Sequence, residues 1–359
     1  MYRDNENASL LLPPSYFAGA NTRYGFRGLF DTLFSRAQAD ALYILQGGPG
    51  TGKSRFMQEV FQAARPLCTQ AELYYCSSDP DSLDGILLDL PGGRVGILDG
   101  TAPHGRLMSA PGYFENIINL GDFWDSARLQ AFGGEIAAAD AEKKEAWQRG
   151  YAALSAAGIH MAERHRQLLR IFRKEKAERF FCRMLKSINP QKGPQSEKYI
   201  DALGMTGRVH LRTAEQFYPE CYQLHDVLGA SALCLEILWQ QACREGVLAV
   251  RLPDPVDPAL SAGICFPGTG VCILKECAEP IKVINSGRFL SPEGLKADRA
   301  SLRRLTHDSA DAIHRALECF ADAGIYHFAL ENIYSATMDF SAKEEKTQIF
   351  IRTLLAGRM

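Results

Sequence analysis

Short apolar runs and one helical repeat of apolar residues alternate along the first hundred residues. Residues 41–45, 72–75 and 94–98 each have the length and apolar character of a buried strand. Between the first two runs, apolar residues recur at helical spacing across 56–64. Strands that alternate with helices predict an α/β domain with a mainly parallel sheet flanked by helices.

A glycine-rich segment joins the first of these strands to the helix. It has the pattern GxxxxGK[ST], in which glycines let backbone N–H groups curl around a phosphate and the following helix N-terminus adds positive charge. We expect Lys53 to contact the β- and γ-phosphates of ATP and the Ser54 hydroxyl to bind Mg²⁺. The predicted nucleotide-binding residues are Gly47, Gly48, Pro49, Gly50, Thr51, Gly52, Lys53 and Ser54.

The third apolar run ends in an acid, Asp99. A carboxylate at the end of a parallel strand lies at the sheet edge that holds the phosphate loop, so Asp99 is the second predicted Mg²⁺ ligand. A turn aspartate before Gly100 is the alternative. No Glu follows Asp99, so the common arrangement of a catalytic Glu beside the magnesium-binding Asp is absent and slow turnover is expected.

Carboxylates and hydroxyls crowd the segment Cys76–Gly85, which follows the strand at 72–75. Placed at the same sheet edge, Asp79, Asp81 or Asp84 could orient a water, bind a second substrate or touch the metal. An Asx-rich turn explains this composition equally well. His104 is interpreted as a loop cap, with a phosphate contact as the alternative.

The chain also carries an internal duplication. The segment 118–125 (INLGDFWD) is matched 166 residues later by 284–291 (INSGRFLS), and the same offset relates 157–160 to 323–326. Upstream, 90–99 parallels 266–275. The matches stay in order while their offsets drift, as loop insertions would produce.

Extension of this alignment predicts a second copy without nucleotide chemistry. Lys53 falls on Ala232, Ser54 on Leu233, Asp99 on Lys275, and Asp79-Pro80 on Asp254-Pro255. The polar, Pro- and Gly-rich stretch after the first copy predicts a linker. The expected organisation is a phosphate-loop domain at 1–187, a linker at 188–200 and a degenerate copy at 201–359.

Residues 126–185 have a helical composition, and their last part is basic. Across 162–186 there are nine Lys or Arg residues against three Glu. We interpret this arm as a solvated face around an apolar stripe formed by Leu169, Phe172, Ala177, Phe180, Phe181 and Met184. The alternatives are a cationic lid or a surface for a polyanion such as nucleic acid.

Composition narrows the class of protein. The 359 residues carry a net charge of −2, which argues against a generic nucleic-acid binder. No apolar run is long enough to span a bilayer, and a signal peptide is not expected. The ten cysteines form no CxxC and are expected to be mostly small buried residues in a reducing cytoplasm.

The motifs GGPGTGKS, CSSDPDSLDG, ILDGTAPH and INLGDFWD, in this order, resemble an uncharacterised bacterial family of tandem P-loop ATPases. The resemblance implies duplicated P-loop NTPase-type domains, and this chain departs from it by losing the second phosphate loop. It implies ATP and Mg²⁺ binding but no particular reaction. We expect a slow ATPase, with a small-molecule kinase (Arg164, Arg166 or Arg170 as lid residues) and an ATP-gated protein-interaction module as alternatives.

Overall fold

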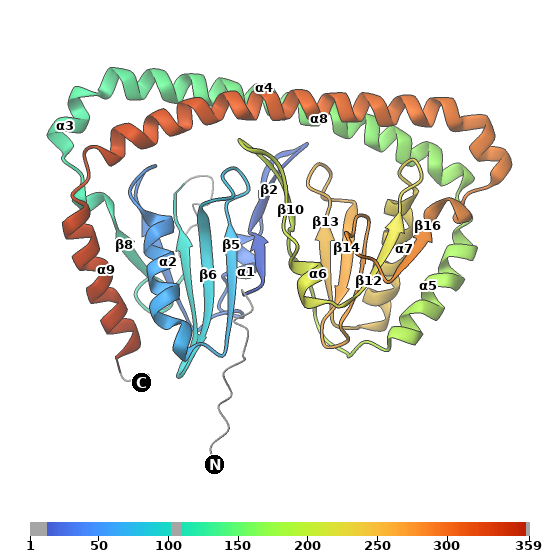
Figure 1. Ribbon diagram of the computed structural model, residues 1–359, viewed down its shortest axis with the longest axis horizontal. Coiled ribbons are helices and arrows are strands. Elements are labelled where there is room, and N and C mark those ends of the chain that lie inside the picture. Colours follow the sequence, from blue (N-terminus) through green and yellow to red (C-terminus); the bar gives the residue numbers. More distant parts are fainter. Residues whose placement is uncertain (1–12, 102–108, 357–359) are drawn as a thin grey trace, which may run out of the picture.

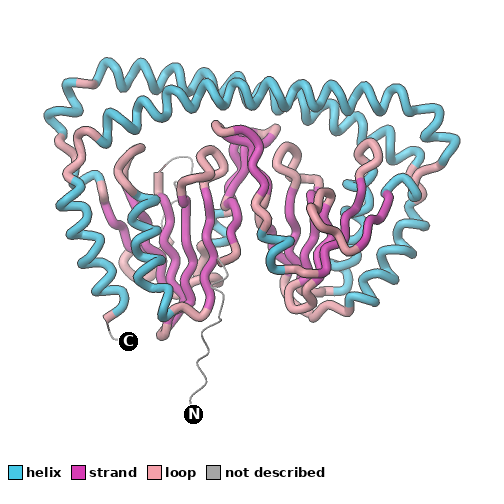
Figure 2. Tube along the Cα trace, viewed as in Figure 1, coloured by secondary structure: helices cyan, strands magenta, loops and turns pink. Residues whose placement is uncertain are grey.

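The computed structural model describes residues 13–101 and 109–356, so His104 lies outside the described residues. The architecture is α/β, as predicted. Two six-stranded mixed sheets are each flanked by helices, and a pair of long helices lies across both of them (Figures 1 and 2). Within the described residues, no helix combines the length and the apolar character that crossing a bilayer requires.

The first sheet has the order β1-β5-β6-β7-β4-β8. Neighbouring strands are parallel except at the two pairings of β6. Strands β4, β5 and β7 therefore point the same way, and the loops that follow them meet at one edge. The strands are β1 (Ser15–Phe17), β4 (Ala41–Gln46), β5 (Gln70–Tyr75), β6 (Leu83–Leu90), β7 (Gly93–Asp99) and β8 (Glu115–Asn119).

The second sheet repeats this plan with the order β9-β13-β14-β15-β12-β16. Its parallel and antiparallel pairings follow the same sequence along the sheet, as a duplicated domain would produce. Strand β9 lies inside the predicted linker 188–200, which is therefore in part an edge strand. The strands are β9 (Gln195–Glu197), β12 (Glu220–His225), β13 (Ala249–Pro253), β14 (Ser261–Phe266), β15 (Val271–Leu274) and β16 (Lys282–Asn285).

Two β-hairpins and two short helices join the sheets in the middle of the molecule (Figure 1). A single apolar cluster there draws buried residues from both sheets, including Leu42, Tyr74, Val250 and Cys272. The two halves thus share a core. The hairpins are β2–β3 (Gly19–Thr22, Gly25–Gly28) and β10–β11 (Asp201–Gly204, Gly207–His210), and the short helices are α1 (Phe30–Leu33) and α6 (Thr213–Phe217).

The helical arms exchange partners between the two halves. After α3 (Ser126–Ala131), helix α4 (Gly133–Ile171) crosses the molecule and α5 (Lys174–Ile188) packs on the second sheet. Helix α8 (Pro292–Ser335) runs back beside α4, and α9 (Phe340–Leu355) packs on the first sheet. A helix of 39 residues is about 58 Å long, enough to bridge two domains.

Because of this exchange, packing does not follow the predicted division at 187 and 201. We call the first sheet with α2 (Lys53–Ala64) and α9 the first lobe, and the second sheet with α5 and α7 (Ala230–Glu245) the second lobe. The short 3₁₀ helices Arg65–Leu67, Gly121–Phe123 and Ser286–Phe289 complete the secondary structure of the described residues.

The apolar stripe of the arm is largely where the sequence places it. Ala177 and Phe181 are buried in the second-lobe core, with Phe172, Phe180 and Met184 packed against it. Leu169 is the exception and is exposed, because α4 ends at Ile171 and the break puts Leu169 on a different helix. All ten cysteines are free thiols, of which four are buried and Cys243 is exposed.

Candidate functional site

The predicted nucleotide-binding residues form the loop between β4 and the start of α2, which we call the glycine loop (Gly47–Ser54). Gly47, Gly50 and Gly52 have φ values of 151°, 70° and 79°, a backbone region that favours glycine. Lys53 extends back over the loop, where its ammonium donates to the carbonyl oxygens of Gly47 (2.9 Å) and Gly48 (2.8 Å). The loop is thereby held as a closed turn at a helix N-terminus.

Two side chains from the loop fix its conformation. The Thr51 hydroxyl is buried and donates to the Gly48 carbonyl at 2.9 Å, across the turn that contains Pro49. The Ser54 hydroxyl accepts from the backbone N–H of Leu83 at 3.0 Å, which ties the first turn of α2 to the start of β6. Ser54 therefore lies beside the acidic segment 76–85.

Asp99 lies next to Lys53. It ends β7, where it pairs with Leu45 of β4, and its Oδ2 is 3.6 Å from the Lys53 Nζ. Its Oδ1 accepts from the Thr101 N–H at 2.8 Å. The parallel pairing of β4 with β7 thus brings the two residues together from opposite sides of the loop, at the sheet edge that the sequence predicts.

The three candidate acids of the segment 76–85 separate in the structure. Asp84 is buried, and burial followed by the nearby Asp99 raises its pKa well above the ordinary value. Asp79 is half-buried and accepts from the Ser82 hydroxyl at 2.7 Å. Asp81 is exposed. The structure therefore brings Asp84 close to Lys53 and Asp99, and leaves Asp81 at the rim.

The far end of α8 covers the glycine loop, which the sequence does not reveal. The Ser335 hydroxyl donates to the Gly50 carbonyl at 3.1 Å. A Cβ added at Gly50 would lie 2.5 Å from the Glu331 carbonyl oxygen, so only glycine permits this approach. Gly48 faces the rings of Trp124 and Tyr334, whose centroids are 5.6 Å apart. The part of this cover that α8 supplies comes from 285 positions further along the chain.

Two polar groups lie close to the glycine loop, one from α8 and one from Trp124. Burial and then Asp79 raise the pKa of Glu331, while the Gly50 N–H and Lys53 act in the opposite direction. The indole N–H of Trp124 is buried and has no acceptor among the described residues. The site therefore contains a carboxylate near the loop and an unused donor beside it.

The corresponding loop of the second lobe is shorter. Six residues separate β4 from α2, whereas four separate β12 from α7. Both helices follow a left-handed glycine, Gly52 or Gly229. Lys53 therefore corresponds to Ala230 and Ser54 to Ser231. The predicted matches to Ala232 and Leu233 are wrong, because the alignment did not include the deletion of two residues from this loop.

Sheet register tests the other predicted matches. Ile44 pairs with Leu98 and Gln223 with Leu274, so Lys275 occupies the position of Asp99, as the sequence predicts. The match of Asp79-Pro80 with Asp254-Pro255 is wrong. The N–H of Cys76 bonds to Ser82 as that of Asp254 bonds to Leu260, which aligns Asp79-Pro80 with Asp257-Pro258.

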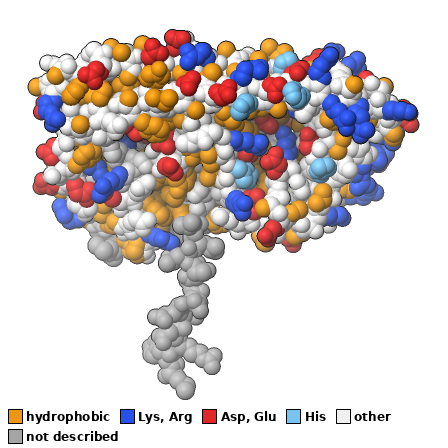
Figure 3. All heavy atoms as spheres, turned by 45° about the horizontal axis from the view of Figure 1, so that its top comes forward, with side chains coloured by type: hydrophobic (Ala, Val, Ile, Leu, Met, Phe, Trp, Pro, Cys, Tyr) orange, Lys and Arg blue, Asp and Glu red, His pale blue; other side chains and the backbone are white. Residues whose placement is uncertain are grey.

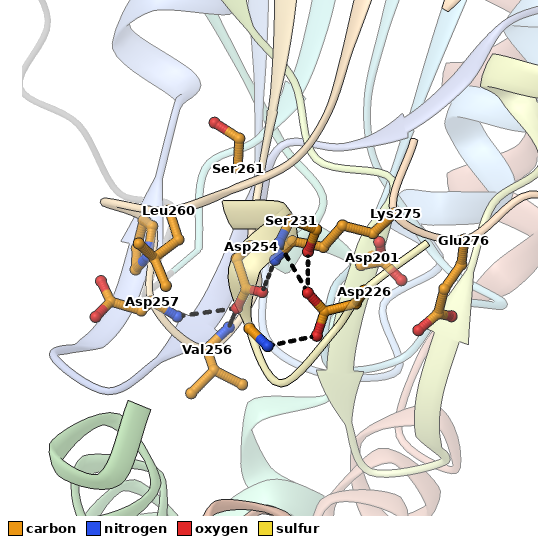
Figure 4. Close-up of polar contacts among 12 residues, drawn as sticks. Asp201, Asp226, Ser231, Asp254, Val256, Asp257, Leu260, Ser261, Lys275 and Glu276 are labelled. Carbon is orange, nitrogen blue, oxygen red and sulfur yellow. Dashed lines mark hydrogen bonds and ion pairs between the residues drawn. The ribbon is translucent and has the colours of Figure 1, made fainter. Parts of the chain in front are cut away.

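The shortened loop carries its own anion (Figure 4). The Asp226 carboxylate accepts from the N–H groups of Gly229 (2.8 Å) and Ser231 (2.9 Å) at the start of α7, and from the Ser231 hydroxyl. Lys275 pairs with Asp254 at 3.1 Å. Burial opposes ionisation of Asp254, but Lys275 holds its pKa below the ordinary value. The Asp226 carboxylate and the Lys275 ammonium thus occupy the edge of this lobe that corresponds to the glycine-loop edge of the first lobe.

The basic arm 162–186 lies on the second lobe, since α4 carries it away from the glycine loop. Arg166 and Arg170 are exposed there, and Arg164 faces the second-lobe loop. Figure 3 shows Lys and Arg side chains gathered at the end of the molecule where α4 meets α5. The alternative in which these arginines form a lid over the glycine loop therefore has no support, because they lie on the other lobe.

Comparison with known proteins provides no further assignment. No family model, no curated protein and no solved structure matches this chain. Within 13–101 and 109–356, no group of three or more His, Cys, Asp or Glu side chains is arranged to hold a metal ion by itself.

Proposed function

We propose that the first lobe binds ATP with Mg²⁺ at the glycine loop and hydrolyses it slowly to ADP and phosphate. The observation that carries this proposal is the position of Lys53, which lies over the left-handed glycine loop with its ammonium 3.6 Å from Asp99. A loop of N–H groups, a lysine and an adjacent carboxylate are the parts that phosphoryl transfer from a nucleoside triphosphate needs. We also propose that the chain is a member of the tandem P-loop ATPase family that its sequence motifs resemble.

The residues at the glycine loop fit both the phosphates of ATP and Mg²⁺. The orphaned indole N–H of Trp124 and the N-terminus of α2 suit an anion. Asp99 and Ser54 offer oxygen ligands beside Lys53. A divalent cation there would favour ionisation of the buried Asp84, whose pKa burial and Asp99 otherwise raise. Mg²⁺ bound there would neutralise charge on the β- and γ-phosphates.

In this proposal the chain acts by positioning and by charge. Lys53 exchanges its bonds with the Gly47 and Gly48 carbonyls for the phosphates, which places a cation where charge develops in the transition state. Thr51 and Ser54 keep the turn and the first turn of α2 in place. The cover of α8 keeps bulk water from the loop.

Glu331 is our candidate for orienting the attacking water. No Glu follows Asp99, but α8 brings the Glu331 carboxylate close to the Gly50 N–H, Asp79 and Lys53. Burial raises its pKa, which moves the carboxylate toward the range in which it works as a general base. Asp79, on the facing loop, is the second candidate for this role.

A second role, as an ATP-gated interaction module, is favoured by the same helix. Helix α8 contacts the glycine loop at Ser335 and the second lobe near its start, so a shift at the loop is transmitted along one rigid element. The kinase alternative has no comparable support, because its lid arginines lie on the other lobe.

The test compares Lys53→Met with Lys346→Met, which removes an exposed lysine of α9. Binding of a fluorescent ATP analogue and release of phosphate are measured with Mg²⁺ and with excess EDTA. We expect Lys53→Met to weaken ATP binding at least about a hundredfold, as loss of a buried charge contact would, with no change in Lys346→Met. Unchanged ATP binding and turnover in Lys53→Met would refute the proposal.

A further inference from the structure

A cavity of about 360 Å³ lies in the second lobe, beneath the pair α4 and α8. Its floor is the edge where β12, β13 and β15 end, together with the hairpin β10–β11, and its roof includes Thr306, Ser309 and Ile313 of α8. The edge at the carboxyl ends of parallel strands is where α/β proteins bind ligands. The volume is that of a small-molecule site.

Most charged groups that line this cavity are already paired. Lys275 pairs with Asp254 at 3.1 Å, and the two Asp226 oxygens are occupied by Gly229 and Ser231. From the hairpin, Arg208 and His210 both pair with Asp201, at 3.4 Å and 3.1 Å. Arg208 also pairs with Glu276 at 3.7 Å. These groups form a polar floor in which each cationic side chain has a carboxylate partner.

Arg164 differs from its neighbours. It reaches into the cavity from α4, and its Nη1 donates to the Thr306 hydroxyl at 3.1 Å. Burial lowers its pKa, and the carboxylates of Asp226 and Asp254 act on it only from beyond ion-pair distance. Within the described residues it has no ion-pair partner. A guanidinium has five N–H donors and stays charged, so most of its hydrogen-bonding capacity is unused.

The remaining walls are apolar. They are formed by Met161, Ile200, Leu203, Val256, Leu274 and Ile313. A ligand that fits therefore has one anionic head group for Arg164 and an apolar body of modest size. The built-in Asp226 carboxylate argues against a triphosphate here, because it already takes the N–H groups at the start of α7.

We infer that this second-lobe cavity is a binding site for a small organic acid, with Arg164 as the residue that holds its carboxylate or phosphate group. A planar guanidinium binds either anion through paired hydrogen bonds, so both head groups share this chemistry. The inference is independent of ATP binding by the first lobe.

Ligand-observed NMR with three probes tests the site: benzoate, phenyl phosphate and the neutral benzamide. We expect at least one of the two acids to bind the full chain more tightly than benzamide, and which acid binds identifies the head group. In Arg164→Met this binding falls about tenfold or more, as loss of one charge-assisted contact predicts. Arg166→Met, on the exposed face of the same helix, serves as the matched control and leaves binding unchanged.

Ala310→Phe provides a second variant if Arg164→Met does not fold. Ala310 lines the cavity from an exposed position of α8, so the larger ring blocks the site without entering the core. Loss of acid binding in this variant supports the inference. Failure of both acids to bind the unmodified chain, or equal binding by Arg164→Met, overturns it.

Discussion

The two lobes have the same strand order, but the positive and negative side chains at the corresponding sheet edge have exchanged places. The first lobe has a six-residue connection between β4 and α2, followed by Lys53 with Asp99 beside it. The second has a four-residue loop that holds the Asp226 carboxylate, with Lys275 at the Asp99 position. The covering helices follow this inversion, since α8 brings Glu331 to the first loop and α4 brings Arg164 to the second.

This difference teaches how two lobes of the same strand order can satisfy the same helix N-terminus in different ways. A helix N-terminus exposes unpaired N–H groups that need an acceptor. In the second lobe the Asp226 carboxylate is this acceptor, so the N–H groups at the start of α7 are satisfied without a bound anion. The edge is then free to form a cavity with different chemistry.

The largest effect is expected from Glu331→Gln. The amide keeps the size of the side chain and loses the base, so phosphate release should fall about a hundredfold while ATP binding persists. Glu318→Gln, at an exposed position of the same helix, is the control. Single-turnover kinetics and binding of the ATP analogue separate the two steps. Equal turnover in Glu331→Gln and the unmodified chain would remove Glu331 from the mechanism.

The next effect concerns the cover over the loop. Gly50→Ala combines a left-handed backbone with a contact at 2.5 Å to the carbonyl of Glu331, so we expect about 3 kcal/mol of destabilisation. Gly92→Ala has a similar φ of 87° and open space, and should cost about 1 to 2 kcal/mol. Denaturant unfolding measures both. Equal losses would mean that α8 does not press on the loop.

A smaller effect tests the built-in anion. Asp226→Ala removes the acceptor at the start of α7 and should destabilise the chain by about 1 to 2 kcal/mol. Added phosphate should then raise the melting temperature of this variant more than that of the unmodified chain, because the N–H groups are free again. Asp81→Ala, at an exposed loop position, provides the baseline. If added phosphate raised the melting temperatures of the unmodified chain, Asp226→Ala and Asp81→Ala by the same amount, Asp226 would not occupy an anion site.

The smallest effect is a pH dependence that comes from His210 on the hairpin β10–β11. Hydrogen bonds to Asp201 and then Glu215 raise the pKa of His210 to about 10 from an ordinary value of 6.5. The stabilisation from protonated His210 is complete below pH 6.5 and is lost as pH rises toward 10. Melting temperatures of the unmodified chain should therefore fall over this range more than those of His210→Gln. Parallel curves would show that His210 is not held in its charged form.

Much of this architecture could be predicted from the sequence. The glycine loop between strand and helix, the strand that ends at Asp99 and its match to Lys275 all follow from local patterns, because strand register preserves local order. The two-residue deletion before α7 could not, since the Gly229 cap is recognised only from its left-handed backbone. The match of Asp79-Pro80 was ambiguous because residues 254–258 contain two Asp-Pro pairs, and only the backbone hydrogen bonds of the turn distinguish them.

The sequence also did not predict that the helical arms α4–α5 and α8–α9 cross to the opposite lobes. An amphipathic helix such as α5 has the same apolar stripe whichever sheet it packs on, so the pattern does not say which lobe receives it. The roof of the glycine loop depends on this exchange. Glu331, Tyr334 and Ser335 therefore carry no local signal that links them to residues near position 50.

The central claim is one nucleotide site per chain, in the first lobe. Calorimetric titration of the full chain with a non-hydrolysable ATP analogue and Mg²⁺ measures the number of sites directly. We predict a single site that is lost in Lys53→Met and retained in Asp226→Ala. Two sites per chain, or one site that survives Lys53→Met, would place the nucleotide elsewhere and contradict the assignment.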